Sequence, residues 1–167
     1  MPNAPVYDML VAFQMNSRRA ELSDLKDFKK AIKKCADTIQ SLAKIKLEKV
    51  RETDDSFKET IGFLFDNLCG LTKTDASLVT TSKTLHFLLP DLFMPIDRRY
   101  TLQFFYGYSP ENEKQCFLQV FEQFRQYAQK HHETLKAQVD KNSHWNRNIP
   151  KVIDNIIIAF VTKNMKK

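Results

Sequence analysis

The segment LKDFKKAIKKCADTIQSL, residues 25–42, carries the most regular pattern in the chain. Its apolar side chains recur at steps of three and four, which places them on one face of an α-helix: Leu25, Phe28, Ile32, Cys35, Ile39 and Leu42. The opposite face is basic, with Lys26, Lys29, Lys30, Lys33 and Lys34. The segment therefore predicts an amphipathic helix with one face in a core and the other in water. The apolar register shifts beyond it, which predicts a break near residue 44.

The same spacing returns along most of the chain, in segments 6–15, 57–68, 75–89, 97–105, 110–137 and 150–161. Only three of the 167 residues are glycine, whereas hairpins, β-bulges and phosphate-binding loops need glycine for their positive φ angles. An all-β fold, a P-loop and a dinucleotide-binding turn are therefore not expected. The sequence predicts an all-α protein, a single compact bundle-like domain over residues 1–167 with six or seven helices.

Several residues mark where these helices are expected to begin and end. Ser23 is suited to cap the helix of residues 25–42, and Gly70 and Gly107 are suited to end the third and fifth helices. The tripeptide SPE at residues 109–111 is typical of a helix start, with a hydroxyl, a proline and a carboxylate. Pro150 opens the last helix, whose wide apolar arc is expected to face the core: Val152, Ile153, Ile156, Ile157, Phe160 and Val161.

The cysteines argue against a metal site and against a secreted protein. Cys35, Cys69 and Cys116 are far apart and lie among apolar residues, which is typical of small buried side chains. There is no C-x-x-C pair, so the sequence predicts no structural zinc, no other metal and no cofactor. The lack of a secretory pattern indicates a cytoplasmic protein. The apolar run at residues 156–161 is too short to span a bilayer, so no membrane partner is expected.

The chain carries a surplus of positive charge, with 26 Lys and Arg against 20 Asp and Glu and a formal net charge of +6. This surplus favours an anionic partner such as DNA or RNA. The lysine face of the helix at residues 25–42, which includes Lys26, Lys30 and Lys33, is the most continuous candidate for a track of phosphate contacts. The alternative is a solvated face that binds nothing.

A second candidate is the stretch TTSKTLHFLLPDLFMPIDRRY, residues 80–100, where two prolines bracket the link between two predicted helices. Lys83 and His86 are three residues apart and lie on one flank of the first helix. Asp97 is expected to cap the second helix, and Arg98 and Arg99 follow it. Free backbone N–H groups and two guanidinium groups at that start predict a phosphate site. In the alternative, Asp97 is only a cap, the arginines pair with carboxylates, and Lys83 and His86 are surface residues.

Two segments resemble uncharacterised prokaryotic helical proteins. One, residues 81–98, has the pattern T-S-K-x-L-H-F-x-x-P-x-L-F-x-P-x-D-R, and the other is residues 145–155. This resemblance implies a helical fold and names no activity. The order of Lys83 and Asp97 is also similar to that of the lysine and the catalytic aspartate in helix-hairpin-helix DNA glycosylases. The chain lacks the glycine-rich hairpin of those enzymes and has a shorter spacing, so the amides that would grip DNA phosphate are not specified.

The segment RQYAQKHH, residues 125–132, resembles the Arg-x(4–6)-His motif of HEPN-type ribonucleases, small helical proteins that are often dimeric. The resemblance implies that the arginine stabilises phosphorane charge while the histidine moves a proton. On a regular helix His132 returns to the face of Arg125, whereas His131 lies about 120° away on the apolar stripe. The catalytic pair would then be Arg125 and His132, with His131 at the core or its edge. The alternative is a chance match within a helix.

Aromatic residues gather at Phe104, Phe105, Tyr106 and Tyr108, where they either stack exposed bases or belong to the core. The leading prediction is a nucleic-acid-associated helical domain that binds phosphate through the Arg98/Arg99 helix start and the lysine face. One alternative is a HEPN-like ribonuclease that uses Arg125 and His132. Another is a protein-interaction or defence adaptor module without catalysis. A homodimer and a protein partner stay open, and the sequence does not decide whether the protein is an enzyme.

Overall fold

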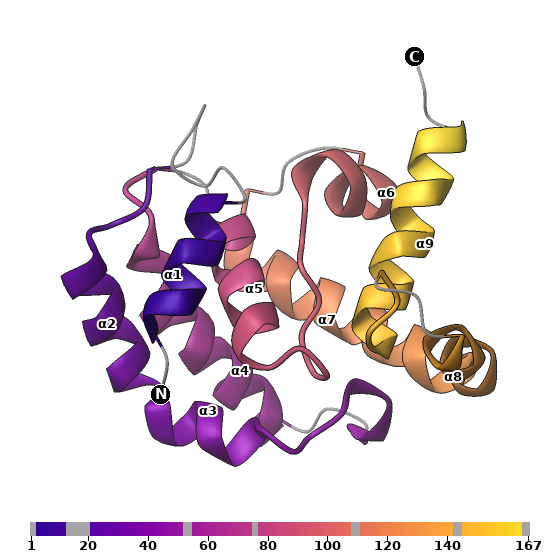
Figure 1. Cartoon of the computed structure of the whole chain (residues 1–167), viewed down its shortest axis with the longest axis horizontal. Helices are drawn as coiled ribbons and strands as arrows, with labels where there is room; N and C mark the ends of the chain where they lie inside the picture. The colour runs from indigo at the N-terminus through magenta and orange to yellow at the C-terminus, as the bar shows by residue number, and fades with distance from the viewer. Residues whose placement is uncertain are drawn as a thin grey trace.

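The computed structural model describes residues 3–12, 21–51, 55–74, 77–107, 111–141 and 145–164. Within these ranges the protein is all-helical, with nine α-helices and no strand (Figure 1). Two 3₁₀ turns, η1 and η2, and one π-helical turn, η3, lie between them. The elements are α1 (Asn3–Ala12), α2 (Leu25–Lys34), α3 (Ala36–Leu42), η1 (Leu47–Lys49), α4 (Asp55–Leu68), η2 (Cys69–Leu71), α5 (Ser77–Leu88), η3 (Arg98–Leu102), α6 (Gln103–Phe105), α7 (Glu113–Lys130), α8 (His132–Asp140) and α9 (Ile149–Asn164).

The long helix α7 runs through the middle of the molecule, and its apolar face forms the centre of the core (Figure 1). Phe117, Phe121 and Phe124 on this face are each at most 1% exposed. Phe93, from the link after α5, stacks on Phe117 with ring centroids 6.0 Å apart and an interplanar angle of 13°. Phe65 of α4 lies 5.2 Å from the same ring. Because aromatic pairs bury a large apolar area in preferred geometries, these contacts join α4, α7 and the link in one core.

The predicted helix of residues 25–42 is two helices, α2 and α3, separated by a turn at Cys35. Cys35 has φ −94° and ψ 1°, so the regular helix stops there. The apolar stripe continues through the turn, because its members from Phe28 to Leu42 are all buried, whereas Leu25 is 36% exposed. α3 ends at Leu42, close to the predicted break.

The double-proline stretch forms α5, a link that begins with a turn at residues 89–92, and η3, so the prediction of two helical elements joined by this link is confirmed. Two side chains of α5 hold the link in place. The Ser82 hydroxyl oxygen accepts a hydrogen bond from the Ile96 N–H at 3.0 Å, and the His86 Nδ1–H donates to the Phe93 carbonyl at 2.7 Å. Residues 92–94 are buried, so the apolar part of the link belongs to the core.

Two breaks raise the number of helices above the predicted six or seven. One is the turn at Cys35, and the other is at His131, where φ is −117° and ψ is 24°. The second break divides the predicted helix of residues 110–137 into α7 and α8. Neither residue is a helix breaker, so the spacing of apolar residues passes through both positions without a signal.

Two predicted helix starts are placed differently. Asp24, and not Ser23, caps α2, since its Oδ1 accepts from the Asp27 N–H at 2.8 Å. α7 begins at Glu113, and the Asn112 side chain caps it by accepting from the Gln115 N–H. The predicted start residues Ser109 and Pro110 lie outside the described residues.

The two glycines predicted to end helices differ in conformation. Gly107 has φ 70° after α6, as expected for a helix terminator. Gly70 lies inside η2 without a positive φ, so its prediction as a left-handed terminator is wrong. The 3₁₀ turn itself ends α4, and it needs no left-handed residue.

The last helix has an apolar arc that is only partly buried. Pro150 lies in the first turn of α9, as predicted. Ile156 is 53% exposed and Phe160 is 49% exposed, so the prediction that the whole arc faces the core is wrong for these two residues. The reason is that α7, α8 and η3 pack against the rest of the arc and leave this side of α9 uncovered.

Cys35 and Cys116 are buried as predicted, and Cys69 is partly buried. Burial raises the pKa of the Cys116 thiol to about 11. Over the described ranges, no helix combines the length and the apolar character needed to cross a membrane.

Candidate functional site

Lys83 and Asp97 both lie close enough to one buried carboxylate on α9, that of Asp154, to influence its charge. The Lys151 amino group donates to Asp154 Oδ2 at 2.6 Å, and Asp154 is 3% exposed. Burial raises the pKa of the Asp154 carboxyl, the Asp97 charge acts in the same direction, and the Lys151 and Lys83 charges oppose it. We call these four residues the ionic corner. Two lysines balance two carboxylates there, so the ionic corner has no surplus of positive charge for an anion.

His86 lies beside the ionic corner and holds the link through its hydrogen bond to the Phe93 carbonyl. Burial lowers the pKa of the imidazole, and the Lys151 charge lowers it further. Because the carbonyl can only accept, Nδ1 carries the proton and Nε2 is the acceptor in the neutral ring. His86 therefore acts in the structure as a neutral donor that fixes the path of the chain.

The two arginines of the predicted helix start point to different partners. Arg98 Nη2 lies 3.7 Å from Glu113 Oε1 at the start of α7. The Arg99 guanidinium lies 5.4 Å from the ring centroid of Tyr100. The Arg99 backbone N–H donates to Asp97 Oδ1 at 2.8 Å, so Asp97 is a cap as predicted. The Asp97 carboxylate thus already accepts the hydrogen bond of the backbone N–H group that a phosphate would need.

Arg125 and His132 are separated by the break between α7 and α8. Arg125 is 6% exposed, and its Nε and Nη2 donate to the two carboxylate oxygens of Glu122 at 2.8 and 2.6 Å. His132 begins α8, and its Nδ1 lies 3.0 Å from Glu133 Oε1. The regular helix that would place Arg125 and His132 on one face is absent, so that geometric prediction is wrong. His131 is exposed and not at the core, because the chain turns at this residue.

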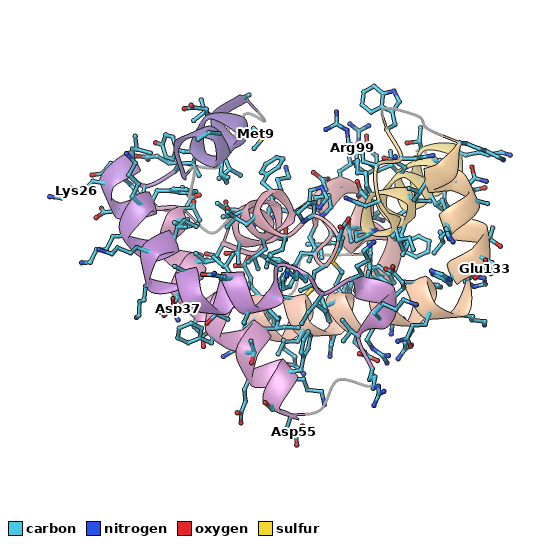
Figure 2. All side chains as sticks on the ribbon, turned by 60° about the horizontal axis from the view of Figure 1, so that its bottom comes forward. Met9, Lys26, Asp37, Asp55, Arg99 and Glu133 are labelled. Carbon is cyan, nitrogen blue, oxygen red and sulfur yellow. The ribbon has the colours of Figure 1, made fainter. Side chains whose placement is uncertain are left out.

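The lysine face of α2 is exposed, as predicted for Lys26, Lys30 and Lys33. Figure 2 shows Lys26 at one edge of the molecule and Arg99 well away from it. The lysine face and the Arg98/Arg99 helix start therefore do not form one continuous surface.

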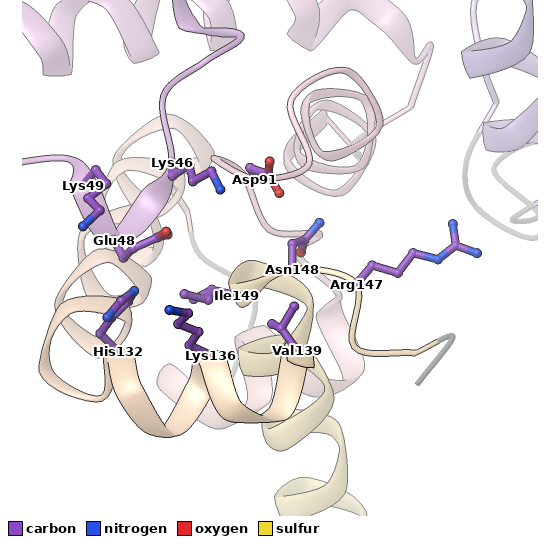
Figure 3. A pocket seen from close by; sticks show the side chains of 10 residues that line it. All are labelled: Lys46, Glu48, Lys49, Asp91, His132, Lys136, Val139, Arg147, Asn148 and Ile149. Carbon is purple, nitrogen blue, oxygen red and sulfur yellow. The ribbon is translucent and has the colours of Figure 1, made fainter. Parts of the chain in front are cut away.

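A hollow of about 460 Å³ opens between η1, α8 and the segment that leads into α9 (Figure 3). We call it the basic hollow, because four cationic side chains, one histidine and two carboxylates line it: Lys46, Lys49, Lys136, Arg147, His132, Glu48 and Asp91. Four positive groups against two negative ones leave an excess of two positive charges. The volume lies within the range of about 300–1,000 Å³ that is usual for ligand pockets.

The lysines of the basic hollow approach it from different elements. Lys46 reaches in from the η1 side and Lys136 from α8, whereas the Arg147 guanidinium lies at the outer edge (Figure 3). Within the part of the chain that the structure describes, Lys46, Lys49 and Lys136 form no ion pair. An anion placed between them would therefore meet amino groups that form no direct ion pair with Glu48 or Asp91, the two carboxylates of the lining.

Backbone and side-chain hydrogen bonds fix the η1 wall of the basic hollow. The Leu47 N–H donates to the Asp91 carbonyl at 2.9 Å, which joins η1 to the link after α5. The Val50 carbonyl, directly after η1, accepts from the Gln129 amide and from Arg125 Nη1. Arg125 and Gln129 thus connect α7 to η1, and this connection is the role that the structure gives to Arg125.

The opposite wall is fixed by the cap of α9. Asn148 Oδ1 accepts from the Lys151 N–H at 2.9 Å, so Asn148 caps the helix, and it also lines the basic hollow with Ile149. The positive end of the α9 dipole therefore lies beside the lysines and adds to the attraction for an anion.

No local sequence pattern points to most of the residues that line the basic hollow. Lys46, Lys49, Lys136 and Arg147 come from distant parts of the chain and match no motif. His132 was singled out, but as a partner of Arg125. The surplus of basic residues was the only sequence signal for this site, and it does not say where the charges meet.

No protein-family model, no curated protein and no solved structure matches the chain. The resemblances noted in the sequence therefore gain no support from these comparisons and stay predictions. In the described ranges, no group of three or more His, Cys, Asp or Glu side chains is arranged to hold a metal ion.

Proposed function

We propose that the protein binds nucleic acid through its backbone phosphates, with the basic hollow as the principal anion site. One observation carries the proposal: Lys46, Lys49 and Lys136 line one hollow and form no ion pair within the described chain. Neutralising phosphates with such groups releases counterions, which is the main source of non-specific affinity for nucleic acid. The exposed lysine face of α2 supplies a second set of phosphate contacts.

The proposal moves the anion site away from the Arg98/Arg99 helix start. Arg98 pairs with Glu113, and Asp97 accepts the hydrogen bond of the Arg99 N–H. A phosphate at that position would have to displace a carboxylate of the protein. In the basic hollow, Lys46, Lys49 and Lys136 form no ion pair within the described residues that a phosphate would have to break.

The test is a titration of a labelled oligonucleotide of about 20 nucleotides, as single strand and duplex, between about 25 and 200 mM salt. Affinity is expected to fall steeply with salt. Lys46→Glu and Lys136→Glu should each weaken binding and reduce the slope of log K against log salt by about 0.7 on single strands or 0.9 on duplex per lost contact. Lys163→Glu is the matched control, since it makes the same charge change at an exposed position in the last turn of α9.

Two results would contradict the proposal. If neither single strand nor duplex binds at the lowest salt concentration, the protein does not bind nucleic acid through phosphates. If Lys163→Glu weakens binding as much as Lys136→Glu, the attraction comes from net charge and the basic hollow is not the site.

The ribonuclease alternative has less support from the geometry. Arg125 is buried against Glu122, and His132 lies beyond the helix break. Incubation of RNA with the protein and with His132→Ala tests it directly. Cleavage by the protein that His132→Ala abolishes would favour the ribonuclease, and intact RNA would remove it.

The alternative of a protein-interaction module has one observation in its favour. Ile156 and Phe160 of α9 expose about half of their surface, and exposed apolar patches often mark sites of association. Sedimentation at increasing protein concentration tests this alternative for a homodimer. Replacement of either residue by a polar one should then shift the protein to the monomer.

A further inference from the structure

An apolar groove of about 300 Å³ lies beside α8, formed by α6, the α7–α8 break and α9. Residues that line it include Phe104, Tyr127, His131, Leu135, Ile153 and Ile156. It combines few polar groups with side chains that are partly exposed, such as Tyr127 at 38% and Ile156 at 53%. Such a groove can accept a flat apolar body from solution without rearrangement of the core.

The groove has an aromatic wall suited to stacking. The Tyr127 and His131 rings have centroids 6.4 Å apart and an interplanar angle of 24°, so they present nearly parallel faces. Phe104 also lines the groove, and it meets Phe160 edge-on, with ring centroids 5.4 Å apart. Successive bases of single strands stack on aromatic side chains in this way, and the contact tolerates any base because every base has a π-face.

The helix break brings the apolar groove next to the basic hollow. His131 lines the groove, and the next residue, His132, lines the hollow. Their Cα atoms are about 3.8 Å apart, as for any consecutive residues. Leu135 and Lys136 repeat the arrangement one turn later, with Leu135 on the groove and Lys136 on the hollow. α8 therefore separates a site for an apolar ring from a site for an anion by the width of one helix.

We propose that the apolar groove takes an unstacked base of a single-stranded nucleic acid whose neighbouring phosphate lies in the basic hollow. This inference rests on the proposed function, and it specifies single strands as the ligand. Charge favours a nucleotide base over other apolar occupants of the groove. Each base is linked to a phosphate, and lysines that form no ion pair within the described residues lie in the adjoining basic hollow. An amphipathic helix fits less well, since its i to i+7 anchors span about 11 Å, and the groove has a volume at the low end of small-ligand pockets.

The experiment compares a mixed-sequence single strand with the same strand carrying abasic sites at its central positions. Both keep every phosphate, so they differ only in the bases. We expect the intact strand to bind roughly tenfold more tightly than the abasic one, the usual size of one stacking contact. Tyr127→Ala should remove this difference and leave the salt slope unchanged, because the lysines are untouched. Phe63→Ala is the matched control, since Phe63 on α4 is 40% exposed and lies outside the groove.

His131→Ala provides a second variant at an exposed position where a loss of folding is not expected. Equal affinity of intact and abasic strands, with a steep salt dependence, would overturn the base site while leaving the proposed function in place. Absence of binding by both strands would overturn both. Self-association that Tyr127→Ala or Ile156→Ala abolishes would assign the groove to a second copy of the chain and overturn the base site.

Discussion

Replacement of Arg125 by methionine tests whether this arginine stabilises the fold, as the structure indicates, or serves catalysis. Methionine keeps most of the apolar stem and removes the guanidinium group. The change breaks two charge-assisted hydrogen bonds to Glu122 and one to Gln129 Oε1, and it removes a donor from the Val50 carbonyl. Such bonds contribute about 1.5–3 kcal/mol each where the charges are buried.

The size of the effect follows from the exposure of the two partners. The Arg125 side chain is 8% exposed, whereas that of Glu122 is 29% exposed and regains water when the pair is broken. The value of 3–5 kcal/mol for a fully buried pair is therefore an upper limit. We expect the free energy of unfolding to fall by about 2–3 kcal/mol, and the melting temperature by about 5–10 °C for a chain of this length.

Urea denaturation at neutral pH measures this change, with Gln126→Met as the matched control. Gln126 also donates to Glu122 Oε1, at 2.8 Å, but it is exposed. Its replacement should change stability by no more than about 0.5 kcal/mol. A loss below about 0.5 kcal/mol for Arg125→Met would refute the reasoning. So would a folded, fully stable variant that had lost an RNA-cleaving activity of the parent protein.

Three further predictions follow from single residues. Because burial lowers the pKa of His86, the unfolded chain takes up a proton at mildly acidic pH that the folded chain does not. The free energy of unfolding should therefore fall as pH drops below about 6.5, by at most about 1.4 kcal/mol per pH unit. The urea midpoints of His86→Asn should lack this part of the pH dependence. Gly107→Ala should lower the free energy of unfolding by about 1 kcal/mol in the same assay, because the residue has φ 70° although no atom blocks a Cβ. Gly70 has equal space for a Cβ and no positive φ, so Gly70→Ala should change the free energy of unfolding by no more than about 0.5 kcal/mol. Cys116, with a pKa of about 11, should resist alkylation at pH 8 in the folded protein. Mass spectrometry should show that the partly buried Cys69 is modified first, and equal rates at the two thiols would contradict the burial of Cys116.

Helices were predictable wherever apolar spacing depends on local contacts. The stripe from Phe28 to Leu42 and the phenylalanines of α7 are buried as their spacing predicts. The breaks at Cys35 and His131 were not predictable, because neither cysteine nor histidine is a helix breaker and local propensity is a weak guide to where a helix stops. Near His131, α7 is held to η1 by Gln129 and Arg125 through the Val50 carbonyl, a contact between residues far apart in sequence.

The candidate site was less predictable than the fold. Lys83 and Asp97 both act on the buried carboxyl of Asp154, which pairs with Lys151 on α9, and the local sequence pattern does not predict this contribution of α9. The basic hollow depends on where η1, α8 and α9 meet, and no local pattern encodes a meeting of three distant segments. The exposure of Ile156 likewise depends on which side of α9 its neighbours cover.

The positions of the apolar groove and the basic hollow depend on the exact number of residues at the joint between α7 and α8. One face of α8 lines the apolar groove with Thr134 and Leu135, and another face lines the basic hollow with His132, Lys136 and Val139. One inserted or deleted residue at the joint would rotate the following helix by about 100°. Leu135 would then leave the groove, and Lys136 would leave the hollow. A substitution at the joint therefore affects only its own contacts, whereas an insertion or deletion there would disrupt both cavities at once.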